Sequence, residues 1–172
     1  MKNLIKKIFG IKDGTSIRGV ITIRAYKAGT NELVQEIISK NMIMQGANIG
    51  KDLIVQKLIA TATGSDPYTL HITHGAIGTS QTAVTSADTR LGAEVARVSP
   101  AFGQDNSSTI AVLQFFFPDS SLTNQTYYEF GTFVDGAAGA NTGQLFNHAL
   151  FGLPYAKAAG IDTTIEVDIT LT

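Results

Sequence analysis

Three histidines are the side chains best suited to bind a metal ion or to move a proton. His71 and His74 lie three residues apart in a segment whose apolar residues alternate as in a β-strand. At that spacing they point to opposite faces of the strand and cannot share a metal ion. His148 is remote in the sequence. We therefore interpret the histidines as surface or partly buried residues and predict no metal site.

Glu129 is the carboxylate in the most unusual setting, because it lies in the aromatic segment Tyr127-Tyr128-Glu129-Phe130. Burial in such a segment raises the pKa of a carboxyl group and could make it a general acid. A buried carboxylate more often pairs with a base, and Arg97, which also lies in an apolar strand, is the natural partner. We favour the ion pair. A glycosidase built on Glu129 is the least favoured hypothesis, because no second carboxylate stands at a motif spacing.

Other motifs with catalytic potential are incomplete. Residues 46–52 resemble a phosphate-binding loop, but three residues instead of four separate the glycines, and Asp52 would repel phosphate. Asp162, Glu166 and Asp168 share one strand face, yet they lack calcium-loop spacing and favour a solvated or interface face. There is no cysteine, no Gly-x-Ser-x-Gly elbow and no Ser-x-x-Lys pair at a helix start. We predict no catalytic residue and no cofactor.

Composition excludes several classes of function. The chain has 172 residues, of which 16% are charged, and its net charge is −1. Soluble domains average roughly 25% charged residues, so the sparse charge suggests that other protein covers part of the surface. A near-neutral chain has no field to hold nucleic acid or an acidic membrane. No apolar run reaches the ~18–20 residues of a membrane span, and Lys6 and Lys7 interrupt any signal peptide.

The elements that must position these residues are mostly strands. Alternating apolar residues predict strands over 17–26, 32–39, 69–77, 92–99, 109–117, 127–134, 144–151 and 161–172, with one helix near residues 46–60. Residues 109–117 have apolar side chains on both faces of the expected strand, which predicts a central strand covered from both sides. The fold class expected is mainly β: a β-sandwich, jelly-roll-like, forming a single domain over residues 15–172.

Residues 1–14 form a separate basic segment before the Asp13-Gly14 turn signal. Lys2, Lys6, Lys7 and Phe9 are its candidate anchoring residues. The segment is either a terminus docked on its own domain or an arm that docks on a neighbouring subunit, and the sequence leaves both readings open.

The order of motifs along the chain resembles a family of small tailed-bacteriophage virion structural proteins. The resemblance covers residues 38–171 and rests on residues 72–79 (ITHGAIGT), 88–91 (DTRL), 94–97 (EVAR), 128–133 (YEFGTF) and 143–147 (GQLFN). It implies that Glu94, Arg97 and Glu129 are recurring charged positions, which we interpret as structural ion-pair residues.

The resemblance implies a non-enzymatic capsid decoration or tail- or collar-associated protein, made in the host bacterial cytoplasm and located in the virion. Its partners would be itself, as a homo-oligomer and by expectation a trimer, and capsid or tail subunits, with no nucleic acid and no membrane. The alternative is a receptor- or carbohydrate-binding module of a phage fibre. Its ligand platform would be Tyr127, Tyr128 and Tyr155, or the loop 135–143.

Overall fold

Antiparallel strands dominate the computed structural model, which describes residues 16–63 and 68–172. Over these residues the prediction of a mainly β fold with one α-helix is confirmed. The strands are β1 (Ile17–Lys27), β2 (Leu33–Ile43), β3 (Ile72–Gly78), β4 (Glu94–Val98), β5 (Phe102–Asn106), β6 (Ile110–Phe117), β7 (Thr126–Val134), β8 (Gln144–Ala156) and β9 (Ile161–Leu171). The helix is α2 (Lys51–Thr63), and a 3₁₀ turn, η1, spans Asp119–Ser121. The arm with Lys2, Lys6, Lys7 and Phe9 lies outside the described residues.

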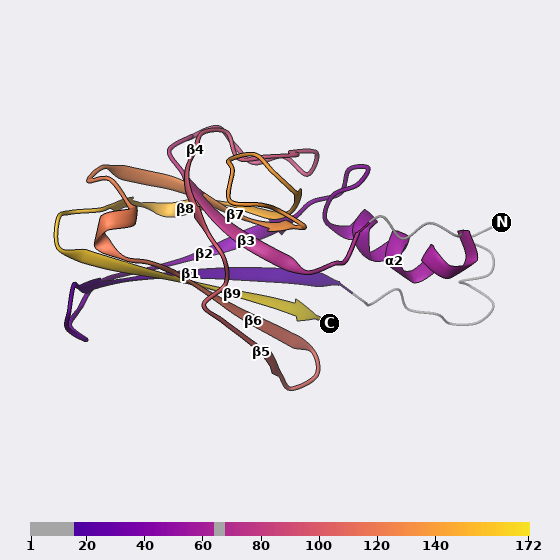
Figure 1. The fold of residues 1–172 in the computed structure, drawn as a ribbon, viewed down its shortest axis with the longest axis horizontal. Coiled ribbons are helices and arrows are strands. Elements are labelled where there is room, and N and C mark those ends of the chain that lie inside the picture. The colour runs from indigo at the N-terminus through magenta and orange to yellow at the C-terminus, as the bar shows by residue number, and fades with distance from the viewer. Residues whose placement is uncertain (1–15, 64–67) are drawn as a thin grey trace.

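The nine strands form one hydrogen-bonded sheet in the order β4-β3-β7-β8-β2-β1-β9-β6-β5, which folds over into two layers (Figure 1). Layer A contains β5, β6, β9, β1 and β2, and layer B contains β4, β3, β7 and β8. Strand β2 belongs to both layers. It pairs with β1 along most of its length, and then Met42 and Ile43 pair with His148 and Asn147 of β8. This order gives a sandwich-like fold and does not confirm the jelly-roll connection.

The main core lies between the layers because alternate residues of each strand point inward. Ile21 and Ile23 of β1 and Val167 of β9 are fully or almost fully buried there. Phe115 of layer A meets Phe130 of layer B with ring centroids 5.5 Å apart. Aromatic contacts of this kind join the two layers.

A second apolar cluster lies on the other side of layer B. Ala76, Phe133 and Leu145 come from β3, β7 and β8, and Leu91 comes from the loop between β3 and β4. This loop, residues 79–93, therefore covers the outer surface of layer B. Layer B is therefore covered on both faces where this loop lies, whereas layer A has one face open to solvent.

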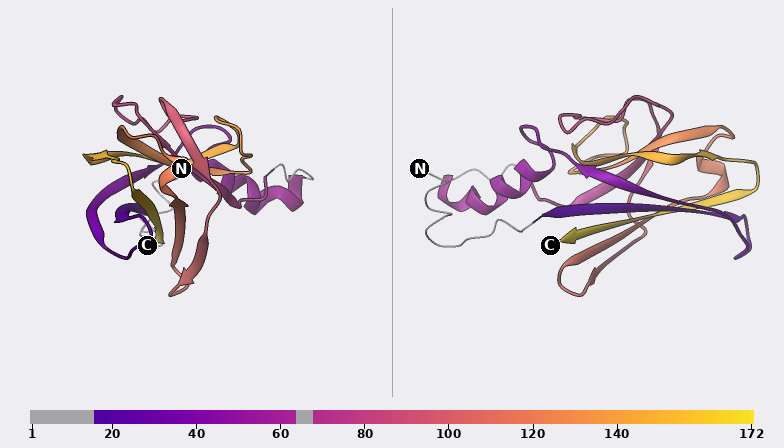
Figure 2. Two further views of the ribbon diagram at one scale, coloured as in Figure 1. Left: turned by 60° about the vertical axis from the view of Figure 1, so that its left-hand side comes forward. Right: turned by 180° about the vertical axis from the view of Figure 1, so that it is seen from behind.

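The helix starts later than the predicted residue 46. Gly50 has φ +50°, and a Cβ added there would lie 2.1 Å from the carbonyl oxygen of Met44. The Gly50 N–H donates to Leu145 at 3.1 Å, and Asp52 accepts the Asn48 N–H at 2.8 Å. Residues 46–50 are thus a turn fastened to the sheet, and α2 extends from the end of the sandwich beyond it (Figure 2).

Two strand predictions need correction. Strand β6 is next to the edge strand, not central, and Phe116 on its outer face is 44% exposed, so only one face of β6 is covered. Strand β5 was not predicted, because its sequence Phe102-Gly-Gln-Asp-Asn106 has no apolar alternation and all five residues are exposed. Its pairing with β6 makes it a strand.

Candidate functional site

A buried chain of three ionisable side chains lies beneath loop 79–93. Glu129, on β7, is 0% exposed and lies beside His148 on the neighbouring strand β8. His148 Nε2 lies 2.9 Å from Glu129 Oε2, and its Nδ1 lies 3.0 Å from Asp88 Oδ2 of the loop. The chain Asp88–His148–Glu129 therefore links the loop to two strands of layer B.

The Glu129 carboxylate also receives hydrogen bonds from the backbone of the loop. The N–H groups of Ser80 and Ala93 donate to Oε1 at 3.2 and 2.8 Å, and that of Gly92 donates to Oε2 at 2.9 Å. Burial alone would raise the pKa of Glu129, but the bonds from His148 and from these three N–H groups outweigh it and hold the pKa below its ordinary value. Glu129 is thus an ionised acceptor, the opposite of a general acid with a raised pKa.

His148 lies between two carboxylates. Burial opposes ionisation of Asp88, but hydrogen bonds from Thr85 and His148 lower its pKa below the ordinary value. His148 turns one ring nitrogen toward each carboxylate, Nε2 toward Glu129 and Nδ1 toward Asp88. Both ring nitrogens are therefore engaged with side chains of the protein itself.

A cavity of 490 Å³ opens beside this chain, and loop residues between Ser80 and Gly92 line it together with Glu129 and His148. The cavity brings solvent near the ionisable groups. However, Glu129 and His148 are fully engaged with each other and with the loop. The arrangement fits a clamp that fixes the loop better than a catalytic centre.

A second ion pair fixes a second loop, residues 135–143. Arg97 and Glu94 form a two-point pair, with Nε–Oε1 2.6 Å and Nη2–Oε2 2.8 Å, and both side chains are almost fully buried. Arg97 Nη1 donates to the carbonyl oxygens of Ala137 and Thr142, and Glu94 accepts the Asn141 N–H. The pair thus binds the backbone of the loop from both sides.

The structure brings together Glu94 and Arg97 but not Glu129 with Arg97. The prediction that Glu129 pairs with Arg97 was therefore wrong, because the side chain that pairs with Glu129 is His148. The reason is the strand order, which places β7 between β8 and β3, whereas Arg97 lies on the edge strand β4.

The predicted tyrosine platform does not exist as a surface. Tyr127 and Tyr155 are 0% exposed and stack in the core with centroids 6.2 Å apart. Their hydroxyl groups bond to Thr123 and Thr163. Tyr128 is half-buried, so the three rings do not form one exposed surface.

The remaining candidates also serve other roles. Glu166 pairs with Arg24 at 3.2 Å, and Asp162 accepts the Asp119 N–H at 2.8 Å. His74 bonds to its neighbour Thr73. Within residues 16–63 and 68–172, no three His, Asp or Glu side chains gather closely enough to hold a metal ion. No helix of this described part is long and apolar enough to cross a membrane.

Sequence reasoning missed His148 and Asp88 as partners of Glu129, and it missed Lys157. The Lys157 side chain is buried and pairs with Asp119 at 2.5 Å. The aromatic neighbours of Glu129 signalled its burial, but nothing in the sequence signalled which base it meets. The strand predictions placed 127–134 and 144–151 consecutively, and assuming a hairpin would have brought His148 near Glu129.

No family model, curated protein or solved structure matches this chain. The resemblance to phage virion proteins therefore stays a prediction from its motifs.

Proposed function

We propose that this chain is a non-enzymatic structural component of a bacteriophage virion, a capsid decoration or a tail- or collar-associated protein, that assembles through contacts between subunits. One observation carries the proposal. The buried ionisable groups of layer B, Glu94, Arg97, Glu129 and His148, bind one another and loop backbone. Their role is to hold two loops in fixed shapes.

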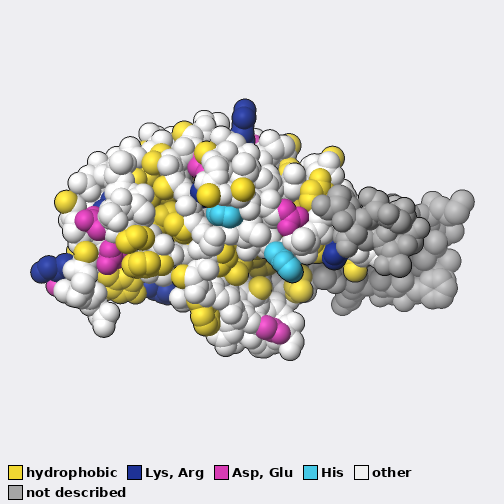
Figure 3. All heavy atoms as spheres, in the orientation of Figure 1, with side chains coloured by type: hydrophobic (Ala, Val, Ile, Leu, Met, Phe, Trp, Pro, Cys, Tyr) yellow, Lys and Arg dark blue, Asp and Glu magenta, His cyan; other side chains and the backbone are white. Residues whose placement is uncertain are grey.

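Fixed loops favour assembly over catalysis. Loop 79–93 and loop 135–143 both adjoin layer B, and each has its own buried ionic clamp (Figure 1). Ordering a loop in advance removes the entropy cost of ordering it on contact with a partner. Charged side chains are sparse over the face shown in Figure 3, as expected for a surface that other subunits cover.

The edge strand β5 is a second feature that supports subunit contacts. Its outer edge pairs with no strand within the described residues, and the β5–β6 hairpin extends from the body of the sandwich (Figure 2). The strand contains no lysine or proline, which commonly protect such edges. We infer that an edge strand of a second copy pairs with β5.

The oligomer tests this part of the proposal. Light scattering on the purified chain should give the mass of a homo-oligomer, with a trimer as the expected number. Introducing Phe102→Lys and Gln104→Lys together places charge on exposed residues of β5 and should dissociate it. An unchanged mass would overturn pairing at β5. Val95→Lys, on the other edge strand β4, should dissociate the oligomer only if β5 pairs with β4.

Location in the particle is tested separately. Quantitative mass spectrometry of purified particles should detect the chain, at high copy number for capsid decoration and at low copy number for a tail or collar part. Its absence from washed particles would reject the virion assignment.

A further inference from the structure

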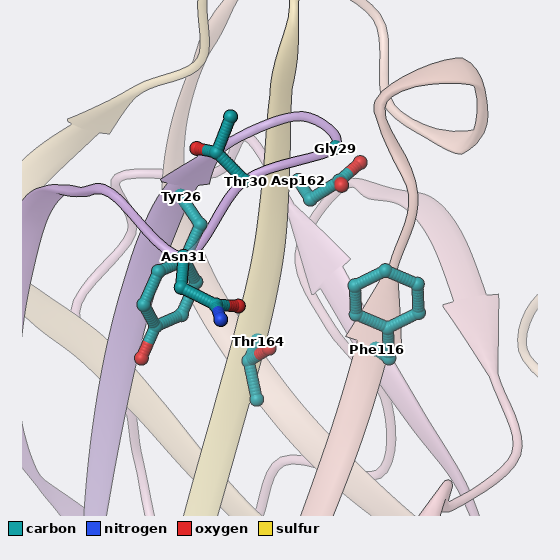
Figure 4. A pocket seen from close by; sticks show the side chains of 7 residues that line it. All are labelled: Tyr26, Gly29, Thr30, Asn31, Phe116, Asp162 and Thr164. Atoms are coloured by element: carbon teal, nitrogen blue, oxygen red, sulfur yellow. The ribbon is translucent and has the colours of Figure 1, made fainter.

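An aromatic-walled pocket lies on the outer face of layer A, the face whose side chains point away from the core. It has a volume of 460 Å³ and lies at the tip of the β1–β2 hairpin. Its walls come from β1, β6, β9 and the hairpin (Figure 4). It is separate from both clamped loops, because they adjoin layer B.

The strand register explains why the sheet is hollow here. Phe116 of β6 and Arg24 of β1 are both paired with Thr164 of β9, and Tyr26 is paired with Asp162 one step along. The strands β1 and β6 that carry the two aromatic side chains thus lie about 10 Å apart, two strand spacings, with the short Thr164 on the strand between them. Figure 4 shows Tyr26 and Asn31 on one side of the hollow and Phe116 on the other.

Phe116 presents a large part of its ring to solvent. It is 44% exposed on a face that lies away from the core, while its neighbours Phe115 and Phe117 are fully buried. An aromatic ring presented to solvent beside a concave surface offers a flat apolar contact to a ligand.

Polar groups in the same pocket are available to a ligand. Within the described part of the chain, the side chains of Asn31 and Thr164 make no hydrogen bond, and one oxygen of Asp162 is used, by the Asp119 N–H. Together they offer an amide donor, amide and carboxylate acceptors and a hydroxyl group. No lysine or arginine lines the pocket, so a phosphate or carboxylate ligand would meet the Asp162 charge without a compensating base.

We propose that this pocket binds a neutral carbohydrate. The C–H face of a sugar ring would pack on Phe116 or Tyr26, and its hydroxyl groups would bond to Asn31, Asp162 and Thr164. The pocket volume lies in the range of about 300–1,000 Å³ that holds small ligands. The proposal does not depend on the virion assignment. It is also compatible with pairing at β5, because a strand added there would lie in the plane of the sheet and leave this face open.

An organic cation is the competing ligand, because aromatic rings and a carboxylate also attract ammonium groups. The amide of Asn31 and the hydroxyl group of Thr164 favour a polyhydroxyl ligand, because a quaternary ammonium ion can form a hydrogen bond with neither. Titration with tetramethylammonium and with neutral saccharides separates the two. Binding of tetramethylammonium with no saccharide binding would overturn the proposal.

The experiment is a screen of the purified chain on an array of neutral glycans, followed by titration of the strongest hit by isothermal calorimetry. Phe116→Ala and Asn31→Ala should each weaken binding by about tenfold or more. Ile38→Ala, at an exposed position on the same face outside the pocket, should leave the affinity unchanged. Thermal unfolding of each variant checks that the fold is intact. No hit on the array, or equal affinities in all variants, would reject the carbohydrate site.

Discussion

The guanidinium carbon of Arg97 lies 4.6 Å from the centroid of the Phe133 ring. The same guanidinium group makes a two-point pair with Glu94 and reaches Thr142 of loop 135–143. Arginine can satisfy an aromatic face, a carboxylate and a carbonyl together because its planar group has five donors in a fixed fork. Lysine has neither the plane nor the fork.

Arg97→Lys should therefore destabilise the protein although the charge is kept. We expect a loss of about 1–3 kcal/mol in the free energy of unfolding, measured with urea. Backbone amides of residues 137–142 should also exchange faster with solvent. Arg24→Lys, in the partly exposed pairs with Glu36 and Glu166, should cost about 0.5 kcal/mol. Equal losses in the two variants would contradict the clamp at Arg97.

Glu129→Gln should loosen loop 79–93. The carboxylate accepts four hydrogen bonds from Ser80, Gly92, Ala93 and His148, and the amide of glutamine would turn a donor toward one pair of these donors. Leaving buried donors unpaired should cost about 2–3 kcal/mol. The measurement is urea unfolding together with hydrogen exchange of the loop. Exchange unchanged in residues 80–93 would show that Glu129 does not hold the loop.

Stability should fall in acid because of the same carboxylates. Folding lowers the pKa of Glu129 below 4.5 and that of Asp88 below 3.8, so the unfolded chain binds more protons than the folded chain in this range. Their contribution is present above those ordinary values and is lost as the pH falls through them toward the folded pKa values.

The free energy of unfolding, measured from about pH 6 downward, should therefore decrease, and more steeply in the wild type than in Glu129→Gln. Glu32→Gln, at an exposed position, provides the control and should keep the wild-type slope. Parallel profiles for the wild type and Glu129→Gln would mean that Glu129 contributes nothing to the acid sensitivity.

Two glycines with positive φ should respond differently to alanine. Gly29, with φ +73°, has open space around its missing side chain, so Gly29→Ala should cost only the backbone penalty of about 1 kcal/mol. Gly50→Ala meets the Met44 carbonyl as well and should cost about 3 kcal/mol or more. Thermal unfolding of both variants gives the comparison. A smaller loss at Gly50 than at Gly29 would contradict the packing of this turn.

Most of the fold could be predicted from the sequence, because alternation reports which strand face is buried. The last strand illustrates this: Ile165, Val167 and Ile169 face the core as their spacing predicts. Strand β5 could not be predicted, since its residues are polar and its conformation depends on β6. The late start of α2 depends on the contact between Gly50 and Met44, which no local pattern encodes.

The site was less predictable than the fold. The burial of Glu129 could be predicted from its aromatic neighbours. That it pairs with His148 depends on the order of the strands, which puts β7 beside β8. Tyr127 and Tyr155 are buried where a platform was expected, because their hydroxyl groups find partners within the core and need no solvent. The sequence around a single residue thus predicted its burial more readily than it predicted the residues that it contacts.

The continuity of β2 through both layers makes the sandwich asymmetric in how it can open. On the β2 side one strand pairs with both layers, while on the opposite side β4 and β5 are not paired with each other and only residues 99–101 connect them. On heating, local opening of the sandwich should therefore begin between β4 and β5. A second copy paired with β5, as proposed above, would cover this opening, so assembly would raise the melting temperature of the chain.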